Sequence, residues 1–122
     1  MVRPSGALQD LFQFVILIKK ALLIALLVRA SVGSSIVAMT MASGIMATMP
    51  AVMGTSMLYR AAMCCAICGG ATALSHVNDA GFWLVTSFLE IDEKTTLKSW
   101  TIMETLIGVT ALIVSFIVSI FA

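Results

Sequence analysis

Apolar residues dominate this chain and gather into long runs separated by short polar stretches. The runs cover residues 11–28, 36–53, 61–74, 82–89 and 101–122. The last run is the clearest membrane-spanning helix, because about 20 consecutive apolar residues cross a bilayer. The other runs are shorter or contain charged, glycine or proline residues. The pattern predicts an all-α membrane protein with about three to four transmembrane or re-entrant segments and interrupted helices.

Two adjacent lysines interrupt the first apolar run. Lys19 and Lys20 lie near the middle of residues 11–28. A single spanning helix would tolerate both ammonium groups only where they face protein or water. The pattern slightly favours two shorter helices, from which both lysines reach the membrane interface.

The string Ser-His-Val-Asn-Asp-Ala-Gly-Phe-Trp occupies residues 75–83, between apolar runs, and contains the only histidine. Hydrocarbon solvates an imidazole, an amide and a carboxylate poorly, so such clusters at membrane depth usually mark a path for a solute. Gly69 and Gly70 precede the string, and Asn78-Asp79 favours a turn. We therefore expect a broken helix whose unwound part lines a transport site. Asp79 could instead simply cap the helix that starts at Ala80.

A second candidate helix start follows Arg29. Gly33 is succeeded by the pair Ser34-Ser35, whose hydroxyls can cap a helix and whose free amide groups can bind a carboxylate. The alternative, which the pattern alone slightly favours, is an ordinary packing helix with a serine cap. Small residues at positions 38, 42, 43, 44 and 47 would let neighbouring backbones approach.

The remaining polar segments are predicted to connect the apolar runs. Residues 50–60 are expected to form a connection, with Tyr59-Arg60 as an interfacial anchor. Residues 90–98 are the only charge-dense run and are expected to form a solvated loop with a short surface helix. Trp100 is expected to mark the membrane interface. Glu104 lies one turn inside the last span, where it either extends towards the headgroups or takes part in proton coupling.

Composition supports a membrane protein and excludes several function classes. The chain is 61% hydrophobic and only 11% charged, whereas soluble domains carry roughly 25% charged residues. A net charge of +1 without a basic block gives no support to a nucleic-acid partner. Cys64, Cys65 and Cys68 share one apolar stretch, where helix packing is favoured over a metal or dithiol site. No catalytic or cofactor motif is present, so neither an enzyme nor a cofactor is predicted.

Three groups of residues resemble the carboxy-terminal part of the gluconate permease family. They are Arg29-x-x-x-Gly33-Ser34-x-x-Val37-Ala38, the string at 75–83, and Thr96 to Trp100 with Met103-Glu104-Thr105. The resemblance covers the chain from about Leu22 onward. Val32 stands where the family usually has glutamine. Family members are several times longer, so residues 1–122 are expected to be one part of a polytopic transporter domain, with an amino-terminal portion missing.

The resemblance implies proton-coupled uptake of gluconate or a related sugar acid by a multi-pass protein of the bacterial inner membrane. It implies substrate contacts by Arg29, Gly33, Ser34, Ser35, His76 and Asn78, and proton coupling by Asp79, His76 or Glu104. The partners are then the sugar acid, protons and the lipid bilayer. Two alternatives remain open: a truncated remnant that does not transport, and a small transporter that assembles from several copies.

Overall fold

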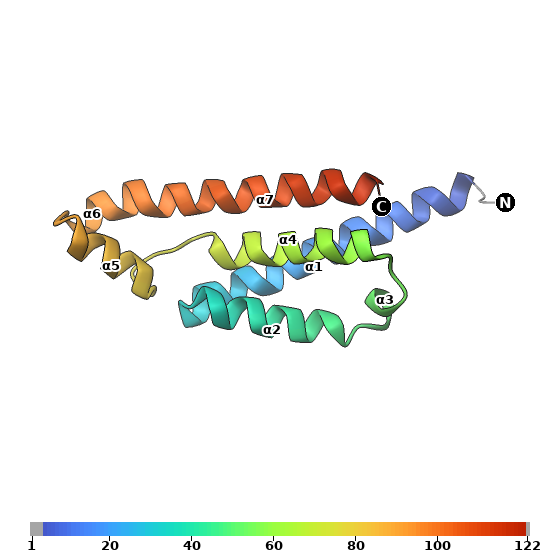
Figure 1. Ribbon diagram of the computed structural model, residues 1–122, viewed down its shortest axis with the longest axis horizontal. Helices are drawn as coiled ribbons and strands as arrows, with labels where there is room; N and C mark the ends of the chain where they lie inside the picture. Colours follow the sequence, from blue (N-terminus) through green and yellow to red (C-terminus); the bar gives the residue numbers. More distant parts are fainter. Residues whose placement is uncertain (1–3, 122) are drawn as a thin grey trace.

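The computed structural model describes residues 4–121 of the chain, and 84% of these residues are helical. No strand occurs among these residues, which confirms the predicted all-α class. Figure 1 shows an elongated bundle in which the long helices run along one axis. Its elements are α1 (Pro4–Val32), α2 (Ser35–Ala47), α3 (Pro50–Met53), α4 (Met57–Thr72), α5 (Ala80–Phe88), α6 (Glu93–Thr96), a π-helical turn η1 (Leu97–Thr101) and α7 (Ile102–Phe121).

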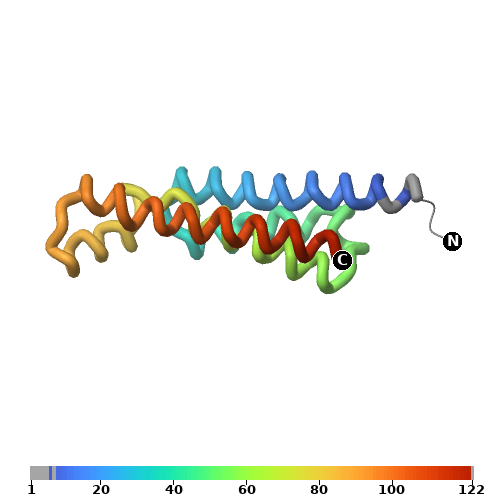
Figure 2. The backbone as a smooth tube through the Cα atoms, turned by 90° about the horizontal axis from the view of Figure 1, so that it is seen from above, coloured from blue at the N-terminus to red at the C-terminus, as the bar shows by residue number. Residues whose placement is uncertain are grey.

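Helix α4 lies between its neighbours and contacts α1, α2 and α7. Figure 2 shows that α1 and α7 run in opposite directions, so the start of α1 and the end of α7 lie towards the same end of the bundle. The other end holds the last turn of α1, the break after α4, and α5 (Figure 1). That end brings together the two polar segments that the sequence singles out.

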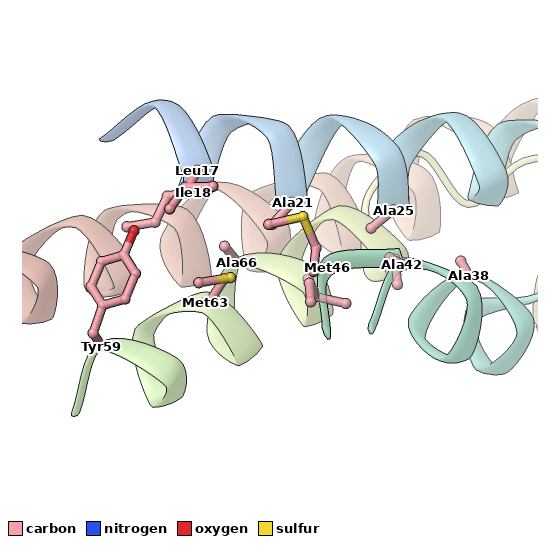
Figure 3. Packing of buried hydrophobic residues seen from close by; sticks show 12 residues of the cluster. Leu17, Ile18, Ala21, Ala25, Ala38, Ala42, Met46, Tyr59, Met63 and Ala66 are labelled. Atoms are coloured by element: carbon pink, nitrogen blue, oxygen red, sulfur yellow. The ribbon is translucent and has the colours of Figure 1, made fainter. Parts of the chain in front are cut away.

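Small side chains dominate the buried core, which is drawn in Figure 3. On α1 and α2 they recur at four-residue spacing, so they share one face of each helix. Small residues let helices pack at close range, as is common inside membranes. The buried alanines of the core cluster are Ala21, Ala25, Ala38, Ala42, Ala66 and Ala71, accompanied by Met46 and Met63.

Glycines set the closest approach of α4 to its neighbours. A Cβ atom on Gly69 would lie 2.8 Å from the carbonyl oxygen of Gly108 in α7. A Cβ atom on Gly70 would lie 2.6 Å from the carbonyl oxygen of Leu22 in α1. Backbones therefore touch on both sides of α4, which fixes α1, α4 and α7 relative to one another.

Two sequence predictions about the amino-terminal half are wrong. Helix α1 is continuous, not two shorter helices, because Lys19 and Lys20 lie on its exposed side while Leu17 and Ile18 are buried. Tyr59 is no interfacial anchor: it is fully buried and its hydroxyl donates to the carbonyl oxygen of Phe14 at 2.8 Å. The predicted connection at 50–60 contains α3 and the first turn of α4.

The charged segment after α5 is mostly helical and continuous with α7. Asp92 caps α6 by accepting a hydrogen bond from the backbone N–H of Thr95 at 3.2 Å. Hydrogen bonds from the side chain and backbone of Thr95 lower the pKa of Asp92. The expected short surface helix is therefore present as α6, whereas the expected loop does not extend beyond Asp92. The helix runs from Glu93 to Phe121, and it joins Leu8–Val32 as the second segment long and apolar enough to cross a membrane.

We expect Gly108→Ala to lower the free energy of unfolding by about 1–3 kcal/mol, the usual cost of overpacking. The added Cβ would lie 2.7 Å from the carbonyl oxygen of Gly69. Gly44→Ala is the matched control, because nothing lies within 4 Å of its added Cβ. Unfolding in mixed detergent micelles measures both. Equal stability of the two variants would contradict the close contact between α4 and α7.

Candidate functional site

The string at residues 75–83 forms the predicted break between two helices. Helix α4 ends at Thr72, and α5 starts at Ala80 with Asp79 as its cap. The Asp79 Oδ1 atom accepts a hydrogen bond from the backbone N–H of Gly81 at 3.2 Å. Leu74 has a φ of 58°, a conformation that is rare for residues other than glycine. The capping alternative raised from the sequence is therefore present, alongside further contacts of the same carboxylate.

The serine-led turn between α1 and α2 contacts this break directly. Ser34 caps α2, since its hydroxyl accepts from the backbone N–H of Val37 at 3.4 Å. Gly33 has a φ of 75°, and a Cβ atom there would lie 1.8 Å from the carbonyl oxygen of Asn78. The two unwound segments are thus in backbone contact. Only glycine fits at position 33, for reasons of both space and conformation.

Asn78 joins the break to the end of α1. Its side-chain amide donates to the carbonyl oxygens of Ala30 at 3.3 Å and Ser31 at 3.2 Å. These carbonyls belong to the last turn of α1, where intrahelical partners run out. Asn78 therefore acts as a cap supplied by a segment 47 residues further along the chain.

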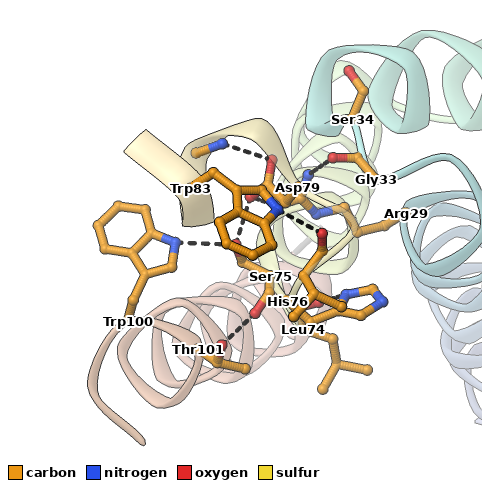
Figure 4. A network of polar contacts seen from close by, with 12 residues as sticks. Arg29, Gly33, Ser34, Leu74, Ser75, His76, Asp79, Trp83, Trp100 and Thr101 are labelled. Atoms are coloured by element: carbon orange, nitrogen blue, oxygen red, sulfur yellow. Dashed lines mark hydrogen bonds and ion pairs between the residues drawn. The ribbon is translucent and has the colours of Figure 1, made fainter. Parts of the chain in front are cut away.

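The centre of the site is an ion pair between Arg29 and Asp79 (Figure 4). The Arg29 Nη2 atom lies 2.6 Å from Asp79 Oδ2, and the two side chains are only 3% and 13% exposed. Arg29 Nη1 also donates to the carbonyl oxygen of Gly33 at 2.8 Å. Arg29 Nε is buried and has no hydrogen-bond partner among the described residues. One guanidinium thus holds both unwound segments and keeps a spare donor.

A hydrogen-bonded chain connects Asp79 to η1, as Figure 4 shows. Ser75, which is fully buried, donates to Asp79 Oδ2 at 2.5 Å. The indole N–H of Trp100 donates to the Ser75 hydroxyl oxygen at 3.0 Å, and Thr101 donates to the Ser75 carbonyl oxygen. Both partners lie on the π-helical turn, a rare geometry that often marks functional sites.

The structure brings together most, but not all, of the predicted site residues. His76 lies in the break, yet its Nδ1 atom is paired with the Leu74 carbonyl oxygen at 2.9 Å, not with Asp79. Glu104 lies on α7, near enough for its carboxylate to interact electrostatically with Arg29 and Asp79, without a direct bond to either. Ser35 is the first residue of α2 and is partly exposed.

Sequence reasoning missed the role of three polar residues. From the sequence, Ser75 is only the first residue of the polar string, Trp100 is expected at the membrane interface, and Thr101 has no predicted role. Trp100 is partly buried and points its N–H at Ser75. The only available signal was that a serine opens the polar string, since spacing along the chain does not show which residues of α7 face the break.

Comparison with known proteins identifies the family. The model of the GntP family permease matches residues 7–121. The chain belongs to the GntP permease family. It is 36% identical over 102 residues to the inner membrane permease YgbN of Escherichia coli, covering 84% of this chain and 22% of that protein. It is 42% identical over 90 residues to the low-affinity gluconate transporter of the same bacterium, covering 74% and 20%.

The gluconate permease of Zymomonas mobilis is 35% identical over 115 residues, covering 92% of this chain and 25% of that protein. The GntP chain thus spans about a fifth to a quarter of the length of these relatives. They are named permeases and transporters, which agrees with the absence of an enzyme motif. Their names and the long apolar helices support a membrane location. No solved structure matches the chain significantly.

We expect Arg29→Met to lower the free energy of unfolding by about 3–5 kcal/mol, because it leaves the Asp79 carboxylate poorly compensated in a mostly buried position. The double variant Arg29→Met/Asp79→Asn should recover most of this loss, since it removes both charges. Unfolding of the three proteins in mixed micelles gives the coupling energy. Additive losses in the double variant would contradict a direct ion pair.

Proposed function

We propose that this chain forms part of the path by which a GntP permease moves gluconate or a related sugar acid, coupled to protons, across the bacterial inner membrane in a multi-pass arrangement. The observation that supports this most is the Arg29–Asp79 ion pair at the contact of two unwound segments. The names of the relatives, which include gluconate transporters, support the substrate class.

In this proposal the carboxylate of the sugar acid replaces Asp79 as the partner of Arg29. A buried guanidinium is costly without a counter-charge, so its anionic partner can be exchanged but not simply lost. The Arg29 Nε–H group has no partner among the described residues, so it can donate a hydrogen bond to the incoming carboxylate before Asp79 leaves. Arginine suits this role because its planar donors match a carboxylate in a bidentate manner.

The coupled proton goes to Asp79 in this scheme. Protonation removes the negative charge that holds Arg29, so uptake of a proton and binding of the anion favour each other. The other titratable groups near this carboxylate are Glu104 on α7 and His76 in the break. Helix α2 contributes no charged residue. His76 and Glu104 are secondary candidates for the proton path, since neither contacts Asp79.

The hydroxyl groups of the sugar acid are assigned to the polar residues around Arg29. Ser34 and Ser35 lie at the start of α2, where free backbone N–H groups also favour an anion. The Asn78 side chain donates through its nitrogen to α1, so only its amide oxygen remains to accept from the solute. Gly33 contributes by letting the backbones of the two segments meet.

Asp79→Asn tests the coupling role in proteoliposomes that contain the complete chain. A gradient of one pH unit corresponds to about 1.4 kcal/mol per proton, hence about tenfold accumulation of solute. We expect native protein to accumulate labelled gluconate to about this level. The variant should exchange gluconate across the membrane without accumulating it. The matched control is Asp92→Asn, an exposed cap outside the site, which should retain accumulation.

The outcomes of this experiment separate the possibilities. Accumulation by Asp79→Asn at the native level would remove Asp79 from the coupling role. Gluconate binding without uptake, in the native chain, would show that this polypeptide holds a binding site but needs further membrane segments for transport. If the native chain neither binds nor takes up gluconate, that result contradicts the proposed function of the isolated chain.

Trp100 is expected to act as a positioning residue that holds Ser75 against Asp79. Trp100→Phe keeps a ring but removes the indole donor to the Ser75 hydroxyl. We expect fewer protons per gluconate transported, with a rate about two- to tenfold lower, as loss of one net hydrogen bond implies. The matched control is Trp83→Phe, which removes an indole hydrogen bond to the Val77 carbonyl oxygen. An unchanged proton ratio in Trp100→Phe would contradict the positioning role.

A further inference from the structure

Two lysines near the middle of α1 play no part in the site described above. Lys19 and Lys20 fall at the centre of the apolar segment Leu8–Val32, and both are exposed. The only ion pair between described residues is Arg29–Asp79. Two ammonium groups on one long apolar helix therefore have no counter-charge within residues 4–121.

The central position of Lys19 and Lys20 on α1 keeps their ammonium groups from reaching the lipid headgroups. At about 1.5 Å per residue, Lys20 lies about 18 Å from either end of the segment Leu8–Val32. This exceeds half the thickness of a bilayer core, which is about 30 Å in total. A lysine side chain covers only a fraction of that distance. Because α1 is one continuous helix, the interfacial position that two shorter helices would have offered is absent.

The surroundings of the lysines are apolar and hollowed. Lys19 and Lys20 line a groove of about 310 Å³ whose other residues are Ile16, Leu23, Ile24 and Leu27. Lys19 also lines a neighbouring groove of about 270 Å³ between α1 and α7, with Phe116 among its walls. A route for a hydrated sugar acid would require polar walls along its length. Apolar walls around isolated cations instead suit an apolar helix that carries a compensating acid.

A second copy of the chain does not offer that acid. The first α7 residue that lines the groove beside Lys19 is Leu112. Glu104 lies eight residues before it, hence about 12 Å from Leu112 along the α7 axis. Asp10 lies about 14 Å away along α1 by the same rise. The other described carboxylates lie at the end of the bundle that holds α5 and α6 (Figure 1). Because the lysines are central, neither a parallel nor an inverted copy would bring a carboxylate to their depth.

We propose that the α1 face around Lys19 and Lys20 is a docking surface for a partner transmembrane helix with a carboxylate at mid-membrane depth. The partner's apolar side chains fill the groove, and its carboxylate pairs with the two ammonium groups. The relatives, of which this chain covers 20–25%, have additional sequence that could supply such a helix. This inference does not depend on transport by the chain.

Association with a defined probe tests the proposal. The complete chain, fluorescently labelled, is reconstituted in lipid vesicles with a leucine-rich transmembrane peptide that carries one central glutamate or, for comparison, one central glutamine. Energy transfer reports binding. We expect about five- to thirtyfold tighter association with the glutamate peptide, the range of one interhelical hydrogen bond inside a membrane. Lys19→Met/Lys20→Met should abolish the preference, whereas Lys94→Met/Lys98→Met, outside the groove, should retain it.

Three results would overturn the proposal. The first is an equal affinity of the native chain for both peptides. The second is energy transfer between copies of the chain that the Lys19→Met/Lys20→Met change removes, which would make a second copy the occupant. The third is rapid reaction of Lys20→Cys with a membrane-impermeant thiol reagent, in a background with Cys64, Cys65 and Cys68 replaced by alanine. That reaction would place the groove on a water-filled route.

Discussion

The contact between Arg29 and Asp79 organises the end of the bundle where the Gly33 turn and the 75–83 break lie. Arg29 and Asp79 are 50 residues apart in sequence. Arg29 comes before α4 in the chain, and Asp79 comes after it. Through this one guanidinium, the Gly33 turn and the 75–83 break are held together. Irregular backbone inside a membrane needs partners within the protein, because lipid provides none. Most polar contacts at this end satisfy that requirement, and the spare donor on Arg29 is the exception.

Much of the site could be predicted from local sequence, because its signals are local. The break at 75–83 and the serine cap at Ser34 depend on residues that favour turns and caps wherever they occur. The hydrogen-bond partner of each site residue is harder to predict from the sequence, because it depends on which face each helix turns towards the break. Trp100 lies within the π-helical turn η1, whose geometry places its side chains on other faces than a regular α-helix would. No spacing rule based on 3.6 residues per turn would have directed its indole at Ser75.

The errors in the fold have a related cause. Lys19 and Lys20 interrupt a linear run of apolar residues and so predict a break, but a helix tolerates charge according to the face that carries it, and both lysines lie on the exposed side of α1. Tyr59 looked like an anchor because it precedes an arginine at the edge of an apolar run, but its hydroxyl finds the Phe14 carbonyl oxygen and its ring packs on that side chain. In each case the packing partner, which lies far away in sequence, decided the outcome.

A cation on an apolar helix needs a counter-charge, and α1 carries two different cases of this constraint, Arg29 and the pair Lys19-Lys20. The buried Arg29 contacts the break and the Gly33 turn, and its counter-charge is part of the chain. Lys19 and Lys20 are exposed and have no ion-pair partner among the described residues, so their counter-charge must come from elsewhere if the helix is surrounded by lipid. The small-residue core leaves no space to turn α1, because its backbone touches that of α4 at Gly70. The faces are therefore fixed, and a helix whose inner side is complete still requires a charged partner on its outer side.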